Sequence, residues 1–413
     1  MTGRRSKRAK TEAANEAPAE VEAPSGGART PTPPPARPSS SSLPLPWVAE
    51  LWGPLEPAAA EACSRGALEV GLSGGRSSAT RLFHRYPLRL IVPKRVTAGS
   101  DADCVWCYSV TFGGGLVAGD RSGMSADVAE GRAAVLSTQG TTKVYKHAGR
   151  TADSETDSAT MDGDWAYSAD DAKTRRETLQ TLAARVAPGG LLASLPDPVQ
   201  AFRGSRFRQT QKIALARDAS VVVVDWIVAG RAAFRGGGVG GFTSGRGGGL
   251  APSEDPNLRV EGGERWRFES YASETEVLLD GEAFAVESVS LRGEDPGGGT
   301  LAERMGATHA LATAIIAGPR AAAAARRARE VAAPIVEARA RGGARGVAGG
   351  GEGGWMLASV SNLPATGADA EATGVILRLA GPDTDAVYGV LREALAPLKD
   401  EIGAPPFGER GLS

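Results

Sequence analysis

The sequence is poor in the residues that most often hold metals or act as nucleophiles. Of its 413 residues only three are cysteine and three are histidine, and aromatic side chains make up 5%. Three cysteines are too few for a disulfide framework in so long a chain, which indicates a reducing compartment. Cys104 and Cys107 form a lone Cys-x-x-Cys pair without the second pair of a zinc site. On a strand these two side chains point to opposite faces, so we interpret them as structural cysteines.

Excess charge and long apolar runs are also lacking. The formal net charge is −1, so the chain lacks the positive excess of a general nucleic-acid binder. It contains no run of 18 apolar residues for a membrane span, and no apolar segment of a secretory signal at its N-terminus. We therefore expect a soluble, cytoplasmic protein. The basic run Arg4–Lys10 fits a nuclear-import signal as well as a solvated chain end.

Glycine, in contrast, is abundant, with 55 residues beside 26 prolines. A Pro- and Ser-rich stretch cannot bury enough apolar surface to offset the entropy of ordering, so we predict a disordered tail over 1–46. One acidic and two Gly-rich stretches predict flexible insertions near 151–174, 234–263 and 341–354. The remainder, 47–413, is predicted to be a single β domain.

Most of that domain reads as short strands separated by Gly, Pro and Asp. The predicted strands are 67–73, 87–92, 104–112, 133–138, 182–186, 212–216, 220–228, 266–271, 276–280 and 286–291. Two helices are predicted, over 320–339 and 384–402, with Pro334 kinking or ending the first and Asp383 capping the second. Strands without helices between them argue against βαβ units. We expect a mainly β fold of stacked antiparallel or mixed sheets with about two helices.

The segment Phe112–Asp120, FGGGLVAGD, formally satisfies a Gly-x-Gly-x-x-Gly/Ala pattern. A dinucleotide site needs a helix next, and an acid about twenty residues on, and the sequence provides neither. We interpret the segment as a tight turn in which glycines permit positive φ or the close approach of another segment, with Asp120 at its rim. A nucleotide-binding enzyme built on this turn is one alternative hypothesis.

A second alternative is RNA binding through the Arg- and Gly-rich segment 235–249 together with the basic tail. Two further patterns are open between a structural and a functional role. Gln139–His147, QGTTKVYKH, is either an anion or partner site or a solvated strand end. Arg231 and Glu264 flank the Gly-rich insertion, so a hairpin would bring them together as an ion pair.

Taken in order, these motifs resemble the UreD/UreH family of urease accessory proteins, over about residues 66–403. The motif that carries most of the resemblance is the Gly-Gly-Leu-Val-x-Gly-Asp turn, followed by a strand ending in Thr-Gln-x-x-Thr-Lys-Val-Tyr. The resembling segments are GGGLVAGD (113–120), ADVAEGRAAVLSTQGTTKVYK (126–146), PGGLLASLPDPVQAFRGSRFRQTQ (188–211), VVDWIVAGR (223–231), GGERWRFESY (262–271) and TGVILRLAG (373–381).

The resemblance implies a non-enzymatic chaperone that docks on apo-urease, joins the UreF and UreG accessory proteins, and assists GTP-driven nickel delivery. It implies no tightly bound cofactor and no nucleic-acid or membrane partner. Nickel would be in transit through an internal channel, which fits a chain without soft Cys/His cages. Asp120 and Glu264 are then weak channel-lining candidates. The positions that match family motifs, as turn or interface residues, are Gly114, Gly115, Gly119, Thr141, Lys143, Tyr145, Arg231 and Trp266.

Overall fold

The computed structural model describes residues 46–52, 57–94, 102–146, 177–230, 264–293, 298–340, 355–365 and 373–408. The predicted tail, apart from Pro46, and the three predicted insertions lie outside these residues, as does Arg231. Within the described part of the chain, no helix is long and apolar enough to cross a membrane.

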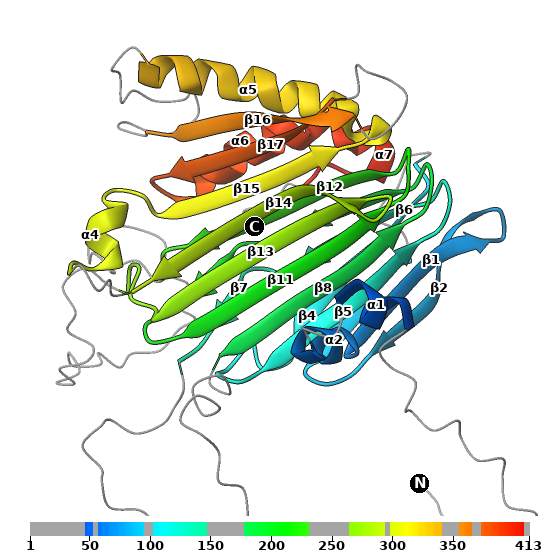
Figure 1. Cartoon of the computed structure of the whole chain (residues 1–413), viewed down its shortest axis with the longest axis horizontal. Coiled ribbons are helices and arrows are strands. Elements are labelled where there is room, and N and C mark those ends of the chain that lie inside the picture. Colours follow the sequence, from blue (N-terminus) through cyan, green and yellow to red (C-terminus); the bar gives the residue numbers. More distant parts are fainter. Residues whose placement is uncertain are drawn as a thin grey trace, which may run out of the picture. The chain divides into compact units, whose positions relative to one another are not determined.

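The first of two sheets has seven strands in the order β14-β13-β11-β8-β5-β1-β2 (Figure 1). Both of its edges are antiparallel hairpins whose two-residue loops, Gly74-Gly75 and Asp280-Gly281, have positive φ as hairpin loops of this length favour. The inner strands pair in parallel. The strands are β1 (Gly66–Ser73), β2 (Arg76–His84), β5 (Arg121–Val128), β8 (Thr178–Val186), β11 (Arg206–Leu215), β13 (Ser270–Leu279) and β14 (Glu282–Arg292).

The second sheet has ten strands and a main order β16-β17-β15-β12-β9-β6-β4-β3, with β10 paired to β12 and β7 paired to β10. Its members are β3 (Leu88–Ile91), β4 (Cys104–Thr111), β6 (Ala133–Thr138), β7 (Thr142–Val144), β9 (Leu191–Leu195), β10 (Val199–Ala201), β12 (Ser220–Val228), β15 (Ala310–Ala317), β16 (Leu357–Ala365) and β17 (Thr373–Gly381). The strands β4, β6, β9 and β12 are parallel neighbours, whereas β15, β16 and β17 are antiparallel.

From β4 to β12 the chain passes repeatedly from one sheet to the other. Parallel neighbours need a long crossover connection, which is usually a helix. Here β5 lies between β4 and β6 in sequence, and β8 between β6 and β9, and both belong to the opposite sheet. In this part of the chain, strands of one sheet therefore serve as the crossovers between parallel strands of the other. The predicted mainly β fold of mixed stacked sheets is confirmed.

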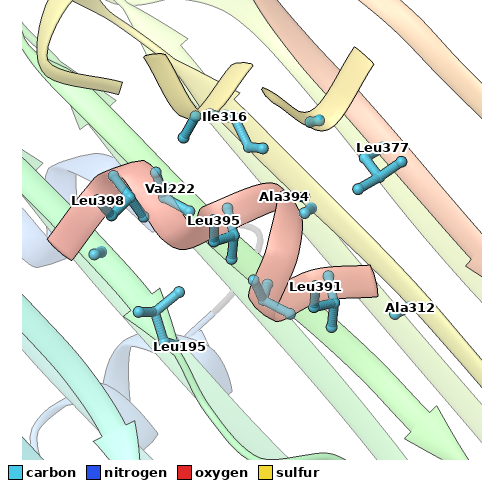
Figure 2. Packing of buried hydrophobic residues seen from close by; sticks show 14 of the residues in the cluster. Leu195, Val222, Ala312, Ile316, Leu377, Leu391, Ala394, Leu395 and Leu398 are labelled. Atoms are coloured by element: carbon cyan, nitrogen blue, oxygen red, sulfur yellow. The ribbon is translucent and has the colours of Figure 1, made fainter. Parts of the chain in front are cut away.

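Helices cover the outer face of the second sheet (Figure 1). α5 (Ala322–Ala340) follows the 3₁₀ turn Pro319–Ala321, and α6 (Thr384–Leu395) is followed by the 3₁₀ turn Ala396–Leu398 and α7 (Lys399–Ile402). Figure 2 shows Leu391, Ala394 and Leu395 lying over the sheet residues Val222 and Leu377. These three helix residues belong to the buried face of α6, at the apolar spacing of an amphipathic helix.

The helix predictions need two corrections and one addition. Pro334 does not end α5, which continues to Ala340, and the Pro334 side chain lies on the exposed side of the helix. The single helix predicted over 384–402 is divided into α6 and α7 by the 3₁₀ turn Ala396–Leu398, which contains Pro397. Asp383 caps α6 as predicted, accepting from the Ala386 amide at 2.7 Å. Three further helices were too short to show a periodicity: α1 (Pro46–Trp52), α2 (Pro57–Cys63) and α4 (Leu301–Met305).

One predicted strand, 266–271, is mostly wrong. The strand β13 begins only at Ser270, and Trp266 lies in a turn with φ 55°. Its indole Nε1 donates to the Thr308 carbonyl at 2.8 Å, and the side chain is buried. The tertiary contact of this large ring overrides its strand propensity.

Candidate functional site

A cavity of about 400 Å³ lies between the two sheets. Its walls come from both sheets and from the turn after β4, and two of its lining residues, Gly114 and Gln139, are exposed, so the cavity opens there. Most polar groups in the wall are hydroxyls, amides and carboxylates, which are oxygen donors of the kind that hard divalent cations prefer. Among them are Ser109, Ser122, Thr138, Gln180, Ser194, Asp197, Gln209, Gln211 and Asp225.

The turn Gly113–Asp120 forms one rim of the cavity. Gly113, Gly114 and Gly119 have positive φ, as the turn interpretation expects. Asp120 stabilises the turn, since its Oδ2 accepts from the Val117 amide at 2.9 Å, and its side chain is not in the cavity wall. The chain then enters β5 directly, so the helix N-terminus that a dinucleotide site of the Gly-x-Gly type needs is not there.

Glycine is needed at position 115 because another segment of the chain packs closely against it, and not because its φ is positive. A Cβ atom there would stand 2.5 Å from Tyr145 Cε2 and 2.6 Å from the Lys143 carbonyl oxygen. The adjacent Leu116 amide donates to the same carbonyl at 2.8 Å. The motif residues of 113–120 and 141–145 therefore form one packed unit, which explains why they stand together in the resemblance.

The structure brings some of the predicted site residues together and separates others. Thr141 and Lys143 join Gly114 and Gly115 in the cavity wall. Tyr145 packs edge-on against Phe202, with ring centroids 5.1 Å apart. These positions combine a structural role with a place at the cavity mouth.

Glu264 lies away from the cavity wall, next to the end of β12. The Trp266 amide donates to the Ala229 carbonyl at 2.8 Å, and a Cβ on Gly230 would stand 2.9 Å from the Glu264 carbonyl oxygen. The two ends of the Gly-rich insertion are therefore adjacent, as the hairpin interpretation expected. The predicted ion pair with Arg231 involves a residue outside the described ones.

Asp225 is an acidic residue of the cavity wall, and sequence reasoning missed it as a site residue. Its Oδ1 accepts from Gln209 Nε2 at 3.0 Å and from the Tyr271 hydroxyl at 3.4 Å, while the Ser273 hydroxyl donates to Oδ2. Burial raises the pKa of the Asp225 carboxyl, and these three donors oppose the shift. The only sequence signal was a carboxylate that interrupts an apolar strand.

Asp197 is a second acidic wall residue, from the Leu-Pro-Asp-Pro segment after β9. It accepts a hydrogen bond from the Tyr388 hydroxyl on α6, and the neighbouring Pro196 carbonyl accepts from Trp226 Nε1 at 2.9 Å. The C-terminal helix thus holds one wall of the cavity. The segment was visible in the sequence, but its partner lies 191 residues further along the chain.

The side chain of Gln180 indicates that the cavity can hold a polar molecule. Its Oε1 is buried, and no group among the described residues donates to it. A buried acceptor without a protein donor is expected to be met by water or a ligand. No group of three His, Cys, Asp or Glu side chains at metal-binding range is found in the described ranges.

The cysteines are all buried or half-buried thiols. Cys104 packs against the cluster under the helices and Cys107 against the cluster between the sheets, so the pair points to opposite faces of β4 as predicted. Burial raises the pKa of both thiols to about 12. They therefore form neither a chelating nor a redox pair.

A two-sheet β protein with an oxygen-lined interior cavity and capping helices is the class that the fold and site define. The family model described as "UreD urease accessory protein" matches residues 64–237 and 259–410, which is most of the chain. The chain therefore belongs to the UreD family of urease accessory proteins, as the motif resemblance predicted.

Curated relatives agree with this assignment. The chain is 34% identical to "Urease accessory protein UreD" of Sorangium cellulosum (strain So ce56) over 336 residues, covering 81% of this chain and 80% of the relative. It is 30% identical to "Urease accessory protein D" of Oryza sativa subsp. japonica over 364 residues, covering 86% and 97%. The protein of the same name from Arabidopsis thaliana is 29% identical over 354 residues, covering 83% and 99%.

Proposed function

We propose that this chain acts without catalysis of its own in urease maturation, binding apo-urease together with UreF-like and UreG-like partners and passing nickel to the enzyme through the cavity between its sheets. The observation that supports this most is the cavity itself. It is about 400 Å³, opens to the surface, and is lined by oxygen donors including Asp225 and Asp197. Dispersed oxygen ligands attract Ni²⁺ without trapping it, because borderline metals bind tightly to imidazole and thiolate.

The mouth of the cavity also has the character of a docking surface. Phe112 and Val117 flank the rim glycines and are 46% and 54% exposed, and Tyr86 beside them is 75% exposed. The Tyr86 and Phe112 rings pack with centroids 5.8 Å apart. Exposed aromatic side chains next to an opening are typical of a protein interface. We propose that a partner covers the mouth here, so that metal enters the cavity from that partner.

Asp120 and Glu264 lie outside the cavity wall, and we propose that they act there. Asp120 lies on the rim turn, where a carboxylate attracts a cation before it enters. Glu264 is beside Gly230 at the end of β12. Because we propose that nickel passes along the wall residues, Asp120→Asn is expected to lower nickel delivery less than a change within the cavity.

The test is urease activation in cells that express urease and its other accessory proteins with variants of this chain. Gln180→Trp fills the cavity without breaking a hydrogen bond of Oε1, and should lower urease activation to near the level without this chain. Ser288→Trp, on the exposed outer face of β14, is the matched control and should leave activation unchanged. Full activation with folded Gln180→Trp protein would reject passage through the cavity.

A further inference from the structure

Polar side chains cross the space between the sheets in a continuous row. In the first sheet Gln209 pairs in register with Gln180 and with Ser273, and in the next inward row Gln211 pairs with Thr275, which pairs with Glu287. In the second sheet Asp225 pairs with Thr313, and Thr313 with Arg378. Leaving Arg378 aside, we call the other eight residues (Gln180, Gln209, Gln211, Asp225, Ser273, Thr275, Thr313 and Glu287) the polar seam.

The seam divides the apolar core. On β11, β12 and β13 the inward residues on one side of it, Ile213, Val223 and Val277, belong to one hydrophobic cluster. The inward residues on its other side, Phe207, Ile227 and Tyr271, belong to another. A row of polar groups in the middle of a sandwich costs stability unless each is satisfied, so its repetition in strand after strand indicates a functional requirement.

The seam continues beyond the main cavity. A second cavity of about 10 Å³, which is about the room of one water molecule, is lined by Asp225, Thr275, Glu287 and Thr313 together with apolar side chains. Asp225 is in the wall of both cavities. Its carboxylate therefore separates the large cavity from a small polar space that leads towards the β14 edge.

An ion pair closes the seam at that edge. Arg378 of β17 reaches across to Glu287 of β14 through both carboxylate oxygens, with Nε to Oε2 at 2.9 Å. Its Nη1 donates to the Ser361 hydroxyl on β16 at 2.9 Å. The Arg378 side chain is 39% exposed and that of Glu287 15% exposed, so the guanidinium covers the carboxylate from the solvent side.

We infer that the Arg378–Glu287 pair is a closed gate on a second opening of the interior, at the edge between β14 and β17. With Arg378 in place, a cation meets a positive charge and an occupied carboxylate. When the guanidinium turns to solvent, the Glu287 carboxylate becomes free to bind a cation. Only the small cavity then lies between Glu287 and Asp225. The gate is a property of this chain, and only the identity of its cargo, a divalent cation, rests on the proposed function.

The gate is tested by the chemical accessibility of the small cavity. Thr313→Cys places a thiol in the wall of the small cavity but not of the large one. Its rate of modification by the small cationic reagent 2-aminoethyl methanethiosulfonate should rise at least about tenfold when Arg378→Gln is added, since that change removes a bidentate charged hydrogen bond. Arg81→Gln, which breaks the Arg81–Glu69 pair on β1 and β2, is the matched control and should leave the rate unchanged.

Two further variants keep the outcome decisive. Glu287→Gln releases the same pair with an isosteric side chain and should also accelerate labelling, which covers the case in which Arg378→Gln does not fold. Ser122→Cys lies in the wall of the large cavity and should not respond to either change. Unchanged labelling of Thr313→Cys, or equal acceleration at Ser122→Cys, overturns the gate.

Whether cations pass through this second opening is tested separately, by urease activation. Glu287→Gln should change the yield of active urease at limiting nickel if cations use this opening. Accelerated labelling with unchanged activation would overturn the transport role of the gate. The passage through the large cavity would still be judged by Gln180→Trp alone, so the two proposals fail independently.

Discussion

The hydroxyl of Ser273, on β13 of the first sheet, donates a hydrogen bond to the carboxylate of Asp225, on β12 of the second. This contact joins the two sheets at the cavity wall, to which Asp225 belongs. It holds a carboxylate in surroundings where burial raises its pKa.

Replacing Asp225 by Asn should leave the folded chain as stable as the wild type, or more so, at neutral pH. Because its pKa is raised in the folded state, folding favours the protonated form, and its contribution to stability falls as pH rises above the ordinary value of 3.8. Asn removes that penalty and keeps an acceptor for Gln209. In melting curves between pH 4 and 8, the advantage of Asp225→Asn should grow with pH. A variant that melts well below wild type throughout would show that the donors hold the carboxylate ionised.

Gly115→Val should destabilise the chain by about 1–3 kcal/mol or more, because the new side chain would overlap the Tyr145 ring and the Lys143 carbonyl. Gly114→Ala tests the other reason for glycine in the same turn. It has φ +77° and open space around its Cβ position, so its cost should be only that of the backbone conformation, about 1 kcal/mol. Denaturant unfolding compares the two. An equal, small effect of both changes would contradict the packing explanation.

The thiols of Cys104 and Cys107 should be unreactive in the folded protein. Burial raises both pKa values to about 12, so the reactive thiolate is scarce at pH 8. Titration with a chromogenic disulfide should modify them only as fast as the chain unfolds, and quickly in denaturant. Rapid modification at pH 8, or a disulfide between them under mild oxidation, would contradict their position on opposite faces of β4.

Tyr86→Ser combined with Phe112→Ser should weaken capture of a UreF-like partner without lowering the melting temperature. Both rings are exposed beside the cavity mouth, and losing two aromatic anchors of an interface typically costs more than about 2 kcal/mol. Leu72→Ser, which removes another exposed apolar side chain, 61% exposed at the end of β1, is the control. Co-purification with quantified partner would show the difference. Equal capture by all three proteins would place the interface elsewhere.

The fold class could be predicted because its signals are local. The strand Ser220–Val228 is a run of β-branched residues, and α6 carries both its cap, Asp383, and its apolar spacing within twenty residues. Trp266 shows the limit, since its place is decided by Thr308 rather than by its neighbours in the chain.

The cavity could not be predicted in the same way. β12 is buried on both faces, with Val222 and Val224 under the helices and Val221 and Val223 between the sheets, so its sequence shows no alternation from which to read the direction of Asp225. The partners of that carboxylate come from strands 16 to 48 residues away. Such distant pairings leave no mark in composition or spacing.

The alternation of successive strands between the sheets has a consequence for how the chain reaches its native state. As β4, β5 and β6 leave the ribosome, they join different sheets. Neither sheet can therefore be completed before most of the chain has emerged. Strand pairings between segments that are far apart in the sequence form slowly, and until they form the strand edges stay exposed. Cutting the chain anywhere between β4 and β12 would strip strands from both layers at once, and neither half would be an independent folding unit.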